Sequence, residues 1–181
     1  MLILLEIAAL MRVAFFPFIL IALLIMSTDS GAQGTPSKSC SAPECNQFNF
    51  WLGDWELSYN DTGKGTNSIT KEMNGCVIHE HFHDPSNGYL GESWSVYNTN
   101  LKKWQQTWVD NQGAYIALAG SFSNGRMILF TEPQQMPNGT RKQNRMTFYN
   151  IEQNSFDWDW EASTDGGKTW TMGWHIHYKR K

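Results

Sequence analysis

Three histidines alternate within one short segment, His79, His81 and His83, at a spacing that could hold a metal ion. In an extended strand, residues two positions apart point to the same side about 7 Å apart, so the three imidazoles would share one face. Imidazole nitrogen is a preferred ligand of zinc. The other face, which carries Glu80 and Phe82, is the more apolar, and we therefore expect it to face inward. The histidines would then face solvent, which makes them weak candidates for a metal site.

This orientation would bury Glu80, and a buried carboxylate needs a polar partner or must take up a proton. Arg145 and Gln106 are the partners that we expect across the interior. A carboxylate and a guanidinium in an aromatic pocket would orient a small molecule, although a buried ion pair that only fixes the strand register is an equal alternative. The predicted ligand-binding residues are Glu80, Gln106, Trp108, Arg145, Trp158 and Trp160, and Trp94 and Trp174 are expected to extend the aromatic wall.

Other kinds of chemistry find little support in the sequence. No Ser-His-Asp or Cys-His arrangement has a supporting context, and there is no Gly-rich phosphate loop, so we expect a protein that is not an enzyme. A net charge of -3 and a pI near 5.9 provide no basic surface for nucleic acid, which we exclude as a partner. No pattern identifies a cofactor.

The elements that would position these residues are strands. Aromatic residues make up 14% of the chain, and turn signals such as Asn74-Gly75 and Asn124-Gly125 recur at short intervals, which predicts antiparallel hairpins. A meander of short strands must hide its edges, and closure into an up-and-down barrel does so. About ten strands are predicted, over residues 54–60, 67–73, 76–84, 89–97, 103–110, 115–123, 126–133, 141–150, 155–163 and 170–179.

The last two strands show the clearest alternation of apolar and polar residues. If their apolar rows face each other, Trp158 pairs with Trp174, and Phe156 and Trp160 pair with Ile176 and Met172. The same register places Asp157 opposite His175 on the outer face. We therefore expect His175 to be a structural partner of an aspartate.

The three cysteines allow one disulfide in an oxidising compartment. We expect Cys40 to pair with Cys76, which ties the N-terminal segment to a strand. A Cys40–Cys45 bridge over a small loop is the rival, and Cys76 as a small buried residue is a further alternative.

The N-terminal segment predicts export. Residues 1–32 are expected to form a signal peptide, cleaved after Ala32, with Met11 as a possible true start. An uncleaved anchor is the alternative, because the apolar stretch approaches the length that spans a membrane. We expect a flexible arm over 33–47, a barrel domain over 48–181, a secreted or periplasmic location, and no membrane anchor once the signal is removed.

Two motifs match known structural signatures. Gly53-x-Trp55 resembles the start of the barrel in lipocalins and fatty-acid-binding proteins, which implies that Trp55 plugs the closed end beneath Lys179 or Arg180. Residues 163–170 resemble the Asp-box hairpin of sialidase propellers. One copy cannot build a propeller, so Asp165 and Trp170 are expected to be structural, without glycosidase activity.

A wider resemblance spans nearly all of the chain after the signal peptide. Residues 48–56, 75–80, 103–110, 125–127 and 160–170 together resemble an exported bacterial family of unknown function with a lipocalin-like, calycin-type barrel. This resemblance implies a fold and no established activity.

Three functions follow as alternatives. The first is a barrel that binds a small hydrophobic or aromatic molecule. The second is a haem protein or enzyme similar to nitrobindins, whose haem-ligating histidine lies on the last strand, where His175 and His177 lie here. The third is a filled barrel with a structural or interaction role. The oligomeric state stays open.

Overall fold

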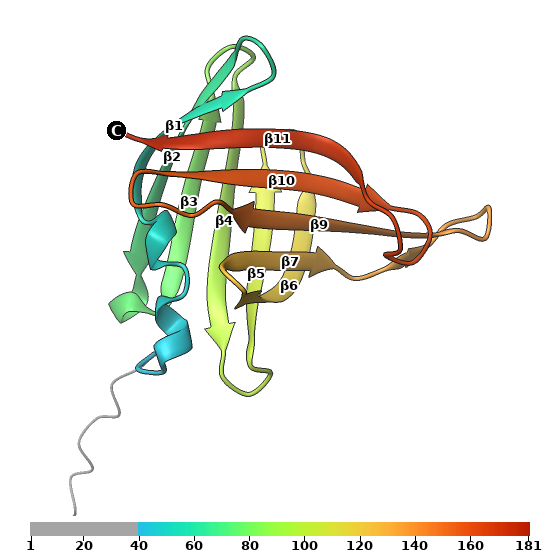
Figure 1. Cartoon of the computed structure of the whole chain (residues 1–181), viewed down its shortest axis with the longest axis horizontal. Coiled ribbons are helices and arrows are strands. Elements are labelled where there is room, and N and C mark those ends of the chain that lie inside the picture. Colours follow the sequence, from blue (N-terminus) through green and yellow to red (C-terminus); the bar gives the residue numbers. More distant parts are fainter. Residues whose placement is uncertain (1–39) are drawn as a thin grey trace, which may run out of the picture. The chain divides into compact units, whose positions relative to one another are not determined.

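The computed structural model describes residues 40–181, which form an all-β domain (Figure 1). No helix in this range is long and apolar enough to cross a membrane. The predicted signal peptide lies outside the described residues. The strands are β1 (Gly53–Tyr59), β2 (Gly63–Glu72), β3 (Val77–Asp84), β4 (Tyr89–Asn98), β5 (Lys103–Asp110), β6 (Tyr115–Ser123), β7 (Arg126–Thr131), β8 (Gln134–Gln135), β9 (Arg141–Tyr149), β10 (Ser155–Ser163) and β11 (Thr171–Arg180), with short 3-10 helices η1 (Pro43–Asn46), η2 (Asn49–Trp51) and η3 (Met73–Gly75).

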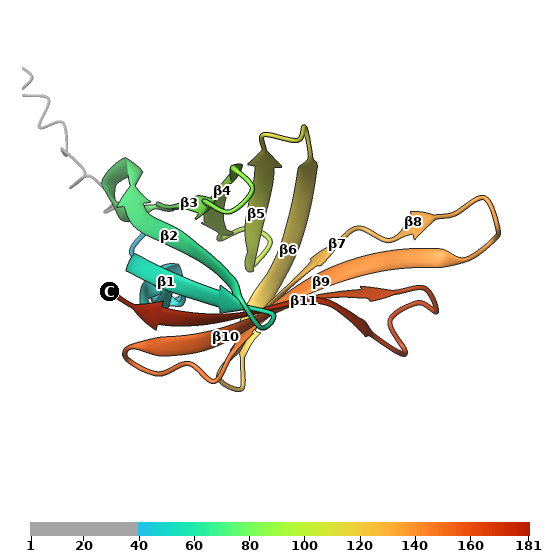
Figure 2. The same ribbon diagram turned by 90° about the horizontal axis from the view of Figure 1, so that it is seen from above.

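The strands close into an antiparallel up-and-down barrel. Each long strand pairs with its neighbours in sequence, β10 pairs with both β9 and β11, and β11 pairs with β1, so no long strand is left with a free edge. Ten strands form the wall, while β8 only extends the β9 hairpin by two residue pairs. Figures 1 and 2 show β9, β10 and β11 reaching beyond the other strands on one side. The predicted ten-strand barrel is confirmed.

Residues that favour tight turns explain where the strands end. Asn124 and Gly125 both have positive φ, at 51° and 72°, and they connect β6 to β7 directly. Two such residues form the tight hairpin turn that matches the twist of the flanking strands. The alternation within each strand then turns one face toward the core and the other toward solvent.

One end of the barrel is plugged by aromatic residues; we call the end at which β1 begins the closed end and the opposite end the open end. Trp55 is fully buried, and its indole nitrogen donates to the Trp51 carbonyl at 2.7 Å. The guanidinium of Arg180 lies 4.2 Å from the centre of the Trp55 ring and donates to the Leu52 carbonyl at 2.7 Å. The structure thus places Arg180, not Lys179, as the cationic lid over Trp55.

The segment before β1 is folded onto this closed end. A disulfide joins Cys40 to Cys76, as predicted, and Cys45 is a buried free thiol within the described residues. The Lys71 ammonium donates to the side chains of Asn46 and Asn49 at 3.1 Å and 2.8 Å. The disulfide and these side-chain contacts attach residues 40–47, the described part of the expected arm, to the barrel.

The predicted register of β10 and β11 is wrong by two residues. Trp158 pairs with Ile176 and Trp160 pairs with Trp174, and the register shifts at a bulge between Trp160 and Glu161. The bulge places an extra residue, Gly173, in β11 near the open end, which apolar alternation alone does not reveal. Accordingly Phe156 pairs with Tyr178, Asp159 with His175 and Asp157 with His177.

Candidate functional site

The barrel encloses a cavity of about 160 Å³. Its buried wall residues lie toward the closed end, whereas half-buried aromatic residues such as Tyr89, Trp160 and Trp174 lie near the open end. The cavity therefore opens to solvent at the open end. Its wall consists of Trp51, Glu80, Phe82, Tyr89, Gln106, Trp108, Ile116, Leu118, Met146, Phe148, Trp158, Trp160, Trp174, Ile176 and Tyr178.

A small polar group lies on this otherwise apolar wall. Glu80 accepts hydrogen bonds from Asn67 Nδ2 at 2.7 Å and from the Ser93 hydroxyl. Gln106 Nε2 donates to Ser93 Oγ at 3.0 Å, and Asn67 Nδ2 also donates to Tyr178 Oη at 3.2 Å. These residues come from β2, β3, β4, β5 and β11, so the network joins both sides of the barrel.

The environment of Glu80 disfavours its charged form. Burial raises the pKa of Glu80 to about 7, although the hydrogen bonds from Ser93 and Asn67 act in the opposite direction. No lysine, arginine or histidine lines the cavity in the described part of the chain. Glu80 is therefore the only ionisable group on the wall that titrates near neutral pH.

Asn67 Oδ1 and Gln106 Oε1 are acceptors of this network that have no partner, and of these two residues it is Gln106 that lines the cavity. Its Nε2 donates to Ser93, but its Oε1 accepts no hydrogen bond, and the residue is only 3% exposed. A buried acceptor without a donor costs free energy, on the order of 1–3 kcal/mol. A molecule in the cavity that offers a hydrogen to this oxygen would remove that cost.

Aromatic rings form the wall toward the open end. Trp158 and Trp160 lie parallel with centroids 6.4 Å apart, and Trp174 meets Trp158 edge-on at 5.8 Å. Phe82 packs edge-on against Trp174 at 5.7 Å and against Trp108 at 6.1 Å. Such faces and edges suit a planar apolar guest.

A single aspartate fixes two of the aromatic residues at the open end. Asp110 accepts hydrogen bonds from the Tyr89 hydroxyl at 2.7 Å and from the Trp108 indole at 3.2 Å. Burial raises the pKa of Asp110, but hydrogen bonds from Ala114, Tyr89 and Trp108 outweigh it, so the net change is downward. The charged carboxylate thus holds both rings in place.

The structure brings most of the predicted ligand-binding residues together. Glu80, Gln106, Trp108, Trp158 and Trp160 all line the one cavity. The wall residues that the sequence analysis did not name can be recognised afterwards as polar or aromatic residues at inward positions of alternating strands. They include Tyr89 and Tyr178, while Asn67 and Ser93 lie behind the wall as hydrogen-bond partners of Glu80.

Two of the predictions for this wall are wrong. Arg145 does not contact Glu80, because it lies on the outer face of β9 directly opposite Glu161, to which it donates at 2.6 Å and 3.1 Å. Trp94 also lies outside the barrel, where it is 39% exposed and stacks on His79. In both cases the residue occupies an outward position of its strand.

The Asp-box segment forms a compact hairpin loop at the open end. The Asp165 carboxylate accepts hydrogen bonds from the Ser163 hydroxyl, the Thr169 hydroxyl and the Lys168 amide, and they hold its pKa well below the usual range. The Trp170 ring lies 4.2 Å from the Arg145 guanidinium and half-buried on the barrel surface, away from the core. These contacts organise the loop itself.

The two histidines of the last strand face solvent. His175 Nδ1 lies 2.7 Å from Asp159, and His177 Nδ1 lies 2.8 Å from Asp157. Because both imidazoles are on the outer face, neither can ligate a group inside the barrel. The haem alternative therefore loses the ligands predicted for it.

The three histidines of β3 also lie on the outer face. His79 is buried beneath Trp94, whereas His81 and His83 are exposed. Glu92 of β4 lies directly opposite His81. Sequence reasoning missed this glutamate, although pairing the predicted strand ends Asp84 and Tyr89 would have placed it there.

Comparison with models of protein families finds no match, and comparison with curated proteins finds no match either. The resemblance to an exported bacterial family therefore stays a prediction. The barrel and the groups that line it are therefore the features that indicate a function.

Proposed function

We propose that the barrel binds a small ring compound that is mostly apolar and carries at least one hydrogen-bond donor, such as a hydroxyl or amino group. The observation that carries this proposal is the unpartnered Gln106 Oε1 on the wall of an aromatic cavity. Ligand sites typically combine an apolar wall with a few placed polar groups.

The size of the cavity limits the ligand. A dry apolar cavity of about 150 Å³ holds one benzene molecule, and the cavity described above has about the same volume, roughly 160 Å³. A single aromatic or alicyclic ring with small substituents is the guest of matching size. The open space also argues against a barrel filled by its own side chains.

The charge of the wall limits the ligand further. Glu80 is the acid on the wall, and no cationic side chain of residues 40–181 lines the cavity to balance a second negative charge. A carboxylate ligand such as a fatty acid would lie unpaired beside this acid, which is unfavourable in a low-dielectric interior. The ligand class is therefore neutral or cationic.

The location proposed for this activity is outside the cytoplasm. Disulfides persist in oxidising compartments, and the Cys40–Cys76 bond supports the secreted or periplasmic location that the N-terminal segment predicts. A binding protein in such a compartment would carry or sequester its ligand.

The test compares phenol with toluene, which share one ring and differ in the donor. We expect phenol to bind more tightly in an NMR titration, and Gln106→Leu to weaken phenol binding about fivefold while toluene binding changes little, because one hydrogen bond is worth about 1 kcal/mol. Gln105→Leu, on the outer face of the same strand, is the matched control. Equal affinities for both probes, unchanged by Gln106→Leu, would contradict the proposal.

Native mass spectrometry of the protein from its own compartment then identifies the natural ligand. A neutral or basic ring compound that is released on unfolding is the expected result. Release of a long-chain acid would show that the charge argument is wrong.

A further inference from the structure

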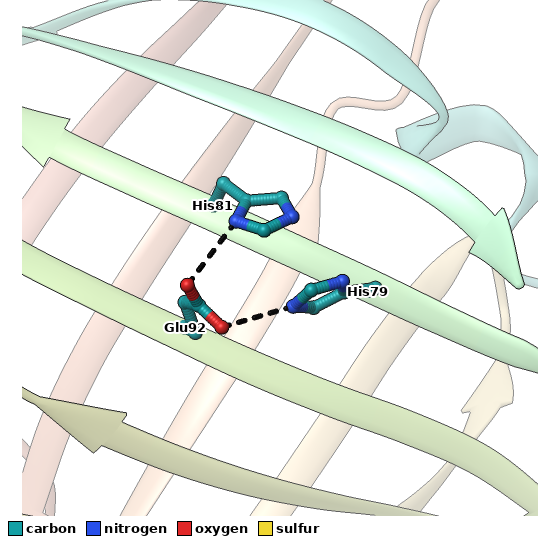
Figure 3. Close-up of side chains that lie close together, drawn as sticks. All are labelled: His79, His81 and Glu92. Atoms are coloured by element: carbon teal, nitrogen blue, oxygen red, sulfur yellow. Dashed lines mark hydrogen bonds and ion pairs between the residues drawn. The ribbon is translucent and has the colours of Figure 1, made fainter.

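The outer face of β3 and β4 carries a cluster of three metal-ligating side chains that the cavity does not use. His79 and His81 are two residues apart on β3, so both point outward, and Glu92 of β4 pairs directly with His81. Figure 3 shows both imidazoles turned toward the Glu92 carboxylate. One potential ligand atom from each residue lies within 4.8 Å of the others.

The distances suit a shared ion. His79 Nε2 lies 3.1 Å from Glu92 Oε2, and His81 Nδ1 lies 3.3 Å from Glu92 Oε1. Donor atoms about 2.0–2.2 Å from a tetrahedral zinc ion are themselves just over 3 Å apart, so an ion could enter with small side-chain rotations. His81 and Glu92 are about half exposed and free to make them.

One of the three ligands is already held in place. The His79 imidazole stacks on Trp94 with centroids 3.6 Å apart and planes 16° apart, and its side chain is only 11% exposed. A fixed ligand loses little conformational freedom on binding an ion, whereas an exposed surface histidine loses more. Trp94, which lies outside the barrel, thus fixes the orientation of the His79 imidazole in this cluster.

The glutamate carries the negative charge that the site needs. Each oxygen of the Glu92 carboxylate faces one of the two imidazoles, Oε2 that of His79 and Oε1 that of His81. The outer side of the cluster borders a groove of about 390 Å³ that His81, Glu92 and His83 help to line. Three protein ligands with an open side are the arrangement in which water or a substrate completes the coordination of a metal.

We propose that His79, His81 and Glu92 form a surface site for a divalent transition-metal ion with one coordination position open, for which Zn²⁺ is the probe. Two imidazoles and one carboxylate favour zinc and similar ions over Mg²⁺ or Ca²⁺, which prefer oxygen ligands alone. The site is on the outer face of the barrel and does not depend on ligand binding inside it.

The test titrates Zn²⁺ into untagged protein freed of metal, in competition with a chromophoric chelator. We expect one ion to bind per chain, and His81→Ala and Glu92→Gln each to weaken binding at least about tenfold, since loss of even an outer partner of a metal ligand has an effect of this size. His83→Ala, on the same strand face but outside the cluster, is the matched control and should bind as the wild type does. A His175→Ala/His177→Ala variant controls for the other surface imidazoles.

Imidazole NMR resonances provide a readout that does not depend on substitutions. On addition of Zn²⁺ to the wild type, those of His79 and His81 should shift while that of His83 stays unchanged. Binding that persists in both His81→Ala and Glu92→Gln, or no binding at all, would overturn the proposal. Far-UV circular dichroism of each variant shows that a loss of binding does not reflect unfolding.

Discussion

A carboxyl group inside an apolar barrel loses the water that would stabilise its charge, and Glu80 receives only two hydrogen-bond donors in exchange. Its protonated form is therefore favoured in the folded protein, and its pKa rises from 4.5 to about 7. Between these pH values the folded chain binds more protons than the unfolded chain. Stability must then fall as the pH rises through this range.

We expect Glu80→Gln to remove this dependence, because the amide carries no charge at any pH. The rise in pKa from 4.5 to about 7 corresponds to roughly 3 kcal/mol, so the variant should gain up to that much over the wild type at pH 8 and little below pH 4.5. Urea unfolding at pH 5 and pH 8 measures the difference.

Glu56→Gln, an exposed substitution on β1, controls for the loss of a negative charge. If Glu80→Gln shows the same stability difference from the wild type at both pH values, Glu80 is ionised throughout and the account of its burial fails.

For single residues, the sequence predicts which side of a strand a side chain lies on better than it predicts the contacts of that side chain. The inward position of Glu80 follows from the apolar residues that alternate with it. Gln106, predicted as a partner from its residue type, reaches Glu80 only through the hydroxyl of Ser93. The misplaced partner, Arg145, lies on an outward position beside Glu161, and only the pairing of β9 with β10 reveals that neighbour. The residue type predicts that a buried charged group needs a hydrogen-bonding or ionic partner. The strand register determines which residue that partner is.

Strands β4 and β5 show how a missing side chain shapes the cavity. A Cβ atom at Gly91 would lie 2.0 Å from the Trp108 ring, so the indole occupies the space that any larger residue would fill. Glycine in a strand often marks such a close approach.

Gly91→Ala should therefore force Trp108 out of place at the mouth of the cavity. We expect a loss of about 1–3 kcal/mol in stability, typical of overpacking, together with a changed near-UV circular dichroism spectrum and weaker phenol binding. Chemical unfolding and the same NMR titration measure both effects.

Gly173→Ala on β11 is the strand-glycine comparison: its Cβ would lie 3.3 Å from the Trp160 carbonyl oxygen, which requires a much smaller shift than the 2.0 Å contact at Gly91. Wild-type stability and phenol affinity in Gly91→Ala would show that Trp108 has room to move and does not shape the site.

At the scale of elements, turn signals and alternation predicted the strands well, but they left the register undetermined. Alternation assigns each residue to a face, and a shift by two residues leaves every face unchanged. Trp174 can pair with Trp158 or with Trp160 while every apolar residue stays on the inner face, and the observed partner is Trp160. The aspartate opposite His175 was misassigned for this reason.

For the whole molecule, the Cys40–Cys76 disulfide joins the segment before the barrel to the turn between β2 and β3. The two cysteines are 36 residues apart, and closing a loop of that length restricts the unfolded chain.

We expect Cys40→Ala/Cys76→Ala to lose about 3–4 kcal/mol on the chain-entropy account of disulfides, with phenol binding retained because the cavity opens at the other end of the barrel. Urea unfolding of the variant, compared with the wild type under reducing and oxidising conditions, measures the loss. A variant as stable as the oxidised wild type would show that contacts such as those of Lys71 hold the segment without the bond.

Closure of the barrel was predictable at this scale because many short strands without helices leave edges that must be hidden. The attachment of residues 40–47 to the barrel was not predictable from their Ser and Pro content. It comes from contacts with distant residues, among them the hydrogen bond from Trp104 to Gln47 at 3.1 Å.

The pairing of β1 with β11 also means that the barrel can close only after β11 has been synthesised. Trp55 pairs with Arg180 of β11, which is synthesised after all the other strands of the barrel. Because synthesis proceeds from the N-terminus, β1 must keep one edge of its backbone unpaired until β11 has emerged. A chain truncated within its final strand would lack both the closing hydrogen bonds and the lid over Trp55, so it would expose an open sheet edge on which other truncated chains could assemble.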